Sequence, residues 1–130
     1  MMAYVYFNPN PWRLTTDDCT VRAISCALGL DWDEAHEMLC ETSREMGLMP
    51  SNQAVFWAFL KQHRFRREMI PDTCPDCYTV RDFARDHPIG TYILATDTHV
   101  LACISGDWMD SWNSGDETPL YFWEKEKKAW

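Results

Sequence analysis

The chain has 130 residues, of which 46% are apolar, and this length is sufficient for one domain that buries a core. The formal net charge of −8 argues against nucleic acid or an anionic membrane as a partner, because both require a basic face. No apolar run approaches the roughly 18 residues that cross a bilayer, and residues 1–8 lack the basic and apolar regions of a signal peptide. We therefore expect a single domain over residues 1–130 that acts in the cytoplasm.

Helical patterns follow an N-terminal arm. Residues 1–18 are expected to be extended, with turns in the Asn-Pro-Asn-Pro stretch at 8–11. An amphipathic run then predicts a first helix from about Cys19 to Leu28, which Gly29 ends. We expect three further helices. The second runs from the N-cap Asp31 to Gly47, and Glu34 completes its capping box. The third runs from near Ser51 or Asn52 to about His63, and the fourth from the N-cap Thr79 to the residue before His87-Pro88.

Short apolar stretches separated by turns predict strands. The expected strands are Phe65–Ile70, Tyr92–Ala95, His99–Ile104, Trp108–Trp112 and Leu120–Trp123. The charged residues 124–128 are expected to form a solvated end. Helices that are followed by an antiparallel sheet define an α+β fold class.

Cys19 stands at the predicted start of the first helix, after the polar residues 15–18. A thiol at this position faces backbone N–H groups without intrahelical partners and the positive end of the helix dipole, and both favour the thiolate. His99 opens a predicted strand eighty residues later, and Asp110 lies in the next one. This chain order is typical of a thiol nucleophile, its base and the group that orients the base.

The length of the turn between these two strands decides which side chain meets His99. If the turn is Ser105-Gly106, Asp110 is the diagonal neighbour of His99 on the same face. If the turn has three residues, Asn113 lies opposite His99. We favour Asp110 as the third group, because a carboxylate stabilises an imidazolium more strongly than an amide does.

Three stretches together carry a resemblance to a known family. The nucleophile helix is matched by residues 18–23 (Asp-Cys-Thr-Val-Arg-Ala), with a second helix after Gly29. The histidine strand is matched by residues 90–94 and 99–102. The strand that supplies the acid is matched by Gly106 and residues 110–112. They resemble the small papain-like cysteine peptidases of phage and bacterial genomes, which are similar in form to the bacteriocin double-glycine leader peptidases. The resemblance covers most of the chain from residue 8 to 123. It implies a papain-like domain in which the nucleophile helix packs on the C-terminal sheet. The implied reaction is the hydrolysis of an amide bond without a metal or cofactor. If the chain is phage-encoded, the implied location is the host cytoplasm.

The oxyanion hole departs from the family pattern. Papain-like enzymes usually have a Gln about six residues before the nucleophile to stabilise the oxyanion, and the residue here is Arg13. The backbone N–H of Cys19 remains as one donor. Asn10, Arg13 or the hydroxyl of Thr15 or Thr16 could supply the second.

The other cysteines are expected to be reduced, because the chain has no export signal and Cys26, Cys40 and Cys103 occupy apolar positions. Cys74 and Cys77 have the spacing of half a zinc site or of a redox pair. A structural zinc site needs four ligands and no second pair exists, so a plain turn is favoured, and metal binding by these two residues stays open.

The sequence therefore predicts a cysteine peptidase or isopeptidase. Cys19 attacks the carbonyl, His99 takes the thiol proton and later protonates the leaving amine, and Asp110 orients His99. The expected partner is a peptide or protein substrate; the oligomeric state stays open. The alternatives are a non-catalytic module that holds a peptide in a Trp-rich cleft, and a cell-wall amidase or acyltransferase.

Overall fold

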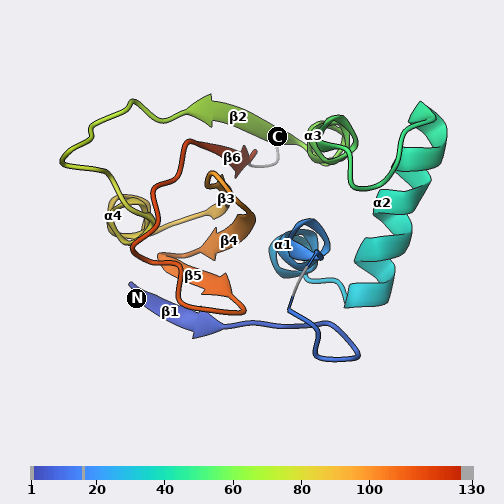
Figure 1. Ribbon diagram of the computed structural model, residues 1–130, viewed down its shortest axis with the longest axis horizontal. Coiled ribbons are helices and arrows are strands. Elements are labelled where there is room, and N and C mark those ends of the chain that lie inside the picture. Colours follow the sequence, from blue (N-terminus) through green and yellow to red (C-terminus); the bar gives the residue numbers. More distant parts are fainter. Residues whose placement is uncertain (1, 16, 127–130) are drawn as a thin grey trace.

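The structure is a computed structural model that describes residues 2–15 and 17–126. Over these residues the chain has an α+β arrangement of four helices and one mixed six-stranded sheet in the order β1-β5-β4-β3-β6-β2 (Figure 1). The elements are β1 (Ala3–Tyr6), α1 (Cys19–Leu28), α2 (Trp32–Met46), α3 (Gln53–Gln62), β2 (Phe65–Met69), α4 (Val80–Asp86), β3 (Thr91–Ala95), β4 (Val100–Ile104), β5 (Asp107–Asp110) and β6 (Tyr121–Lys125). The four expected helices and five expected strands are present, with ends within two residues of those predicted. Residues 127 and 128 of the expected solvated end lie outside the described part, and Glu124 and Lys125 belong to β6.

Local signals account for the helix ends. Asp31 and Glu34 form the expected capping box at the start of α2. Thr79 does the same for α4, with Asp82 as its partner. Gly29 ends α1 with a φ of 68°, a left-handed conformation that glycine adopts without a steric cost.

The N-terminal arm contains a strand that the sequence pattern did not predict. β1 lies parallel to β5, with Ala3 opposite Asp107 and Tyr6 opposite Asp110. The expectation of a purely antiparallel sheet is therefore wrong at this edge. The strand that pairs with β1 lies about a hundred residues away, and a local pattern of apolar residues does not encode a partner at that separation.

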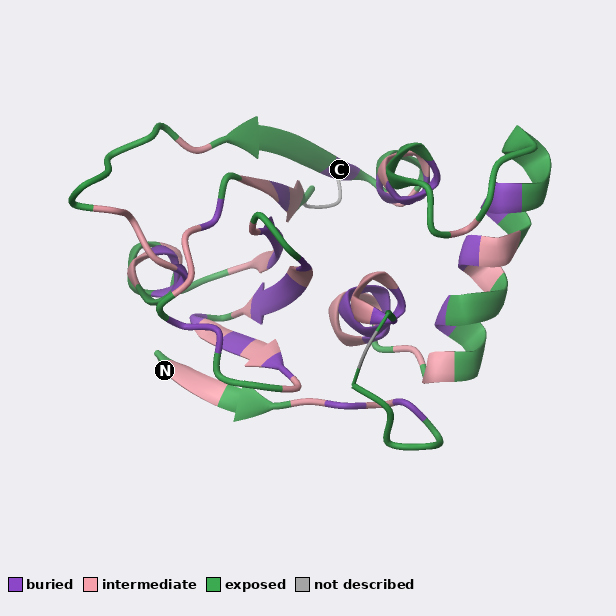
Figure 2. Ribbon diagram, viewed as in Figure 1, coloured by how far each residue is buried: buried purple, intermediate pink, exposed green. Residues whose placement is uncertain are grey.

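The sheet lies between two clusters of buried apolar residues, and Figure 2 shows buried positions in the helices on both sides of it. α1 and α3 pack on one face of the sheet, and α2 packs against these two helices, around a core that contains Phe59, Ile93 and Trp123. α4 packs on the other face against the buried side chains of Leu94 and Leu101. Ile93 and Leu94 are adjacent in β3 but belong to different cores, as the alternation of side chains along a strand requires.

The β4–β5 hairpin has the two-residue turn. Ile104 pairs with Asp107 and Cys103 with Trp108, so only Ser105 and Gly106 lie between the strands. Their φ values of 51° and 82° are both positive, which is the requirement of a type I′ turn. This register is the one that favours Asp110 over Asn113.

Cys74 and Cys77 form a disulfide, with their Cα atoms 4.1 Å apart across an exposed turn. The expectation that all six cysteines are reduced is therefore wrong for this pair, which the turn brings within bonding reach. Cys19, Cys26, Cys40 and Cys103 are free.

Among the helices of residues 2–15 and 17–126, none has the length and apolar character that crossing a membrane requires.

Candidate active site

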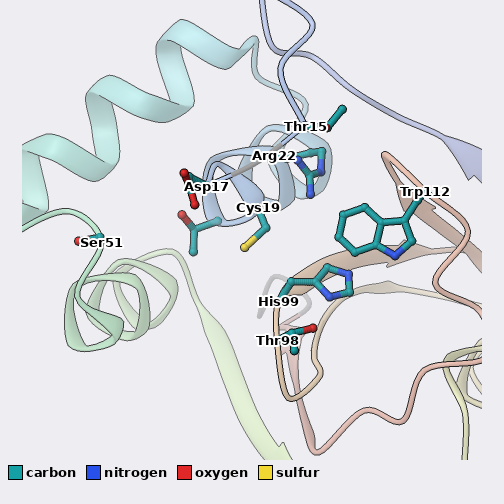
Figure 3. A pocket seen from close by; sticks show the side chains of 9 residues that line it. Thr15, Asp17, Cys19, Arg22, Ser51, Thr98, His99 and Trp112 are labelled. Carbon is teal, nitrogen blue, oxygen red and sulfur yellow. The ribbon is translucent and has the colours of Figure 1, made fainter.

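Cys19 and His99 line the same cavity, which has a volume of about 480 Å³. It lies between the start of α1, the segment before α3 and the end of the sheet where β4 begins (Figure 3). The sulfur of Cys19 points into this space, and the rings of His99 and Trp112 lie on the opposite wall (Figure 3). The remaining lining residues are Thr15, Asp17, Thr20, Arg22, Ser51 and Thr98.

Cys19 is the first residue of α1, as predicted. Asp18 occupies the N-cap position, but its side chain makes no capping hydrogen bond. Its carboxylate instead accepts hydrogen bonds from the side chains of Asn10 (3.1 Å), Arg22 (2.7 Å) and Trp32 (3.1 Å). The first backbone N–H groups of α1 therefore keep their capacity to donate near the thiol.

Thr96 fixes the backbone at His99. The backbone N–H of His99 donates to Thr96 Oγ1 (3.2 Å), and the N–H of Thr96 donates to the carbonyl of His99 (2.9 Å). These bonds close the turn between β3 and β4 and hold His99 just before β4. The His99 side chain is 5% exposed, so its polar atoms depend on partners inside the protein.

Asp110 is fully buried and binds His99. Its Oδ2 atom lies 2.8 Å from His99 Nε2 and accepts a hydrogen bond from the Ser114 hydroxyl at 2.7 Å. Its Oδ1 atom accepts from the backbone N–H of Ser111 at 2.8 Å and from Arg22 at 3.4 Å. A buried carboxylate requires such compensation, and its contact with Nε2 places the proton of a neutral His99 ring on that nitrogen.

Arg22 connects the start of α1 to the end of β5. Its Nη1 atom lies 2.7 Å from Asp18 Oδ1 and its Nη2 atom lies 3.4 Å from Asp110 Oδ1. Its guanidinium also lies 5.9 Å from the ring centre of Trp112. Because Arg22 is 3% exposed, one buried cation compensates two buried carboxylates.

The second ring nitrogen of His99 has its own partners. Nδ1 lies 3.1 Å from Thr96 Oγ1 and 3.2 Å from Glu117 Oε1. Within residues 2–15 and 17–126, no hydrogen bond joins Cys19 to His99. The structure thus brings His99 and Asp110 into contact, and it brings Cys19 and His99 to one cavity without a bond between them.

The oxyanion candidates Asn10 and Arg13 are not among the residues that line the cavity, and their role stays a prediction. Asn10 is buried; its Nδ2 atom donates a hydrogen bond to Asp18, and its Oδ1 atom accepts one from the backbone N–H of Trp12. Both polar atoms of this side chain are therefore bound within the loop before α1. Arg13 is exposed and has a φ of 58°. Of the two threonines, Thr15 lines the cavity, and Thr16 lies outside the described residues.

The side chain of Asn113 forms hydrogen bonds within the hairpin and the loop after β5. Its Oδ1 accepts hydrogen bonds from the Trp108 indole (3.0 Å) and the backbone N–H of Gly115 (3.0 Å). The hairpin register therefore leaves Asp110, not Asn113, beside His99. The two tryptophans of this hairpin also separate: Trp108 belongs to the core under α4, and Trp112 lines the cavity.

The sequence reasoning missed Arg22, Ser114 and Glu117, whose side chains contact Asp110 or His99. Arg22 had a detectable signal, because it follows Cys19 by three residues and so lies on the same face of the helix. Ser114 and Glu117 lie in an irregular loop, where neither periodicity nor strand register predicts the direction of a side chain.

Two of the other free cysteines have thiols in apolar surroundings. Burial raises the pKa of the Cys26 thiol and that of the Cys103 thiol to about 12. Over the part of the chain that the structure describes, no three His, Cys, Asp or Glu side chains are arranged to hold a metal ion.

Comparisons with protein-family models, with curated proteins and with solved structures found no match for this chain.

Proposed function

We propose that this protein is a cysteine peptidase or isopeptidase of papain-like type, with Cys19 as nucleophile, His99 as base and Asp110 as the group that orients the base. The observation that carries the proposal is the pairing of His99 with a fully buried carboxylate on the wall of a cavity that also holds a thiol at a helix N-terminus. A buried carboxylate at Nε2 leaves Nδ1 as the nitrogen that exchanges a proton with the thiol.

In the proposed reaction His99 Nδ1 takes the proton of Cys19, and the sulfur attacks the carbonyl carbon of a peptide. The backbone N–H of Cys19 stabilises the oxyanion. The C–N bond then breaks, the amine leaves with the proton from His99, and a thioester remains on Cys19. Water, activated by His99, hydrolyses the thioester, so that one amide and one water give one carboxylic acid and one amine.

A second candidate is a peptide-binding module without catalysis. It is favoured by one observation: both nitrogens of His99 have partners other than Cys19. Proton transfer to His99 requires Nδ1 to leave Glu117 and Thr96 and to approach the sulfur.

A pooled peptide library read by mass spectrometry separates the two candidates. The peptidase should generate new peptide termini, and Cys19→Ser should abolish them. Asp110→Asn should lower the rate by at least about 100-fold, because the amide cannot stabilise the imidazolium as a carboxylate does. If neither wild type nor any variant cleaves peptides, while Cys19→Ser binds them as tightly as wild type, the protein is a binding module.

A further inference from the structure

One nitrogen of the proposed base has a carboxylate partner that the triad does not include. Glu117 Oε1 lies 3.2 Å from His99 Nδ1, and Asp110 Oδ2 lies 2.8 Å from Nε2. An ionised carboxylate only accepts hydrogen bonds. Both contacts are therefore hydrogen bonds only when the ring carries a proton on each nitrogen. In that form, the proton received from Cys19 would face Glu117 and not the sulfur.

Other contacts hold Glu117 in this position. Its Oε2 atom accepts a hydrogen bond from the Trp112 indole at 3.0 Å, and the indole packs on the His99 ring with 4.4 Å between ring centres. The main chain of Glu117 is fixed separately, because its N–H donates to the carbonyl of Ser114 and its carbonyl accepts from the N–H of Val80. The side chain, which is 33% exposed, can leave His99 without unfolding the loop.

We propose that Glu117 is a latch on the base: it holds Nδ1 of His99 away from Cys19, and catalysis requires its release. This inference rests on the proposed function. The Glu117 carboxylate and the Cys19 thiolate are the two anions that compete for the single Nδ1–H of the imidazolium, and the Thr96 hydroxyl is its neutral neighbour. Trp112 anchors Glu117 and also lines the cavity, so a peptide that enters the cavity contacts the anchor of the latch. Glu117 is thus a positioning residue that regulates the site.

The rate at which iodoacetamide alkylates Cys19 reports the release of the latch. In this reaction the thiolate displaces iodide and forms a C–S bond, and peptide mapping quantifies the product. Glu117→Ala should raise the rate about tenfold, the scale of one charge-assisted hydrogen bond to a partly exposed group. Glu117→Gln should give a smaller increase, because the amide loses the charge but still accepts from Trp112. Asp116→Asn is the matched control, since it removes a neighbouring charge that is 91% exposed and paired with Arg81, and it should not change the rate.

The latch acts through His99, so Glu117→Ala should have no effect in a His99→Ala background. An equal increase in both backgrounds would mean that the charge of Glu117 acts directly on the thiolate, and this result would overturn the latch. A rate that is unchanged or lower in Glu117→Ala alone would overturn it as well. Peptide cleavage measured on the same variants keeps the two proposals apart. If wild type cleaves peptides in a way that depends on His99, but Glu117→Ala does not increase the rate, only the latch is refuted. If neither wild type nor Glu117→Ala cleaves peptides, the proposed function itself is refuted.

Discussion

Replacing Arg22 with Met should strongly destabilise the protein. Arg22 is 3% exposed and is the cation between Asp18, at 2.7 Å, and the fully buried Asp110, at 3.4 Å. Methionine preserves most of the side-chain volume but leaves two buried carboxylates without their cation. Removal of one partner from a buried ion pair costs about 3–5 kcal/mol.

That loss is a large part of the roughly 5–15 kcal/mol that stabilises a typical domain. The entropy of unfolding is about 2.1 cal/mol/K per residue, which over 130 residues gives roughly 0.27 kcal/mol/K. Dividing about 4 kcal/mol by this value predicts that the Tm falls by roughly 15 °C.

Urea unfolding followed by tryptophan fluorescence, together with thermal unfolding, measures both quantities. Arg66→Ala is the control: Arg66 is 62% exposed and pairs with Glu68 and Glu124 on the surface, so its loss should cost at most about 1 kcal/mol. Asp18→Asn should partly rescue Arg22→Met, because it removes one of the two unpaired charges. If Arg22→Met unfolds within about 1 kcal/mol of wild type, the buried charges are compensated in another way and the assigned role of Arg22 is wrong.

Three further predictions concern other parts of the molecule. Burial raises the pKa of Cys26 and Cys103 to about 12, so both should resist alkylation at pH 7 in the native protein and react in urea; rapid native labelling of either would contradict the raised pKa. Gly115→Ala should cost about 1–3 kcal/mol in urea unfolding, because the new Cβ would lie 2.8 Å from Cζ2 of Trp108; a neutral result would mean that the indole moves freely. The Asp82 carboxylate accepts a hydrogen bond from the N-cap backbone of α4, and this bond lowers the pKa of Asp82 below its usual 3.8. The stability that Asp82 contributes is therefore present above pH 3.8 and is lost as the pH falls through the lowered pKa. Asp82→Asn should therefore flatten the dependence of the Tm on pH below about 4, and an unchanged slope would argue against the cap.

Local sequence determined most of the secondary structure and two elements of the site. The helix that begins at Cys19 follows from a polar stretch before an amphipathic run, and Gly29 ends it with a positive φ. The Ser105-Gly106 turn sets the register that brings Asp110 to His99, because both residues take the left-handed conformation of a type I′ turn. Both features depend on residues close together in the chain. The sequence alone predicted the helix, whereas it left the length of the turn open between two and three residues, and the structure has two.

Tertiary structure decided what these residues contact. The pairing of β1 with β5, the position of Arg22 between Asp18 and Asp110, and the contact of Glu117 with His99 each join segments that are distant in sequence or lie in an irregular loop. A local pattern specifies which face of an element is apolar, but the partner of a buried charge depends on which elements the packed core brings together. The sequence therefore indicated a thiol, an imidazole and a carboxylate, and the packing determined that the imidazole contacts two carboxylates and not the thiol.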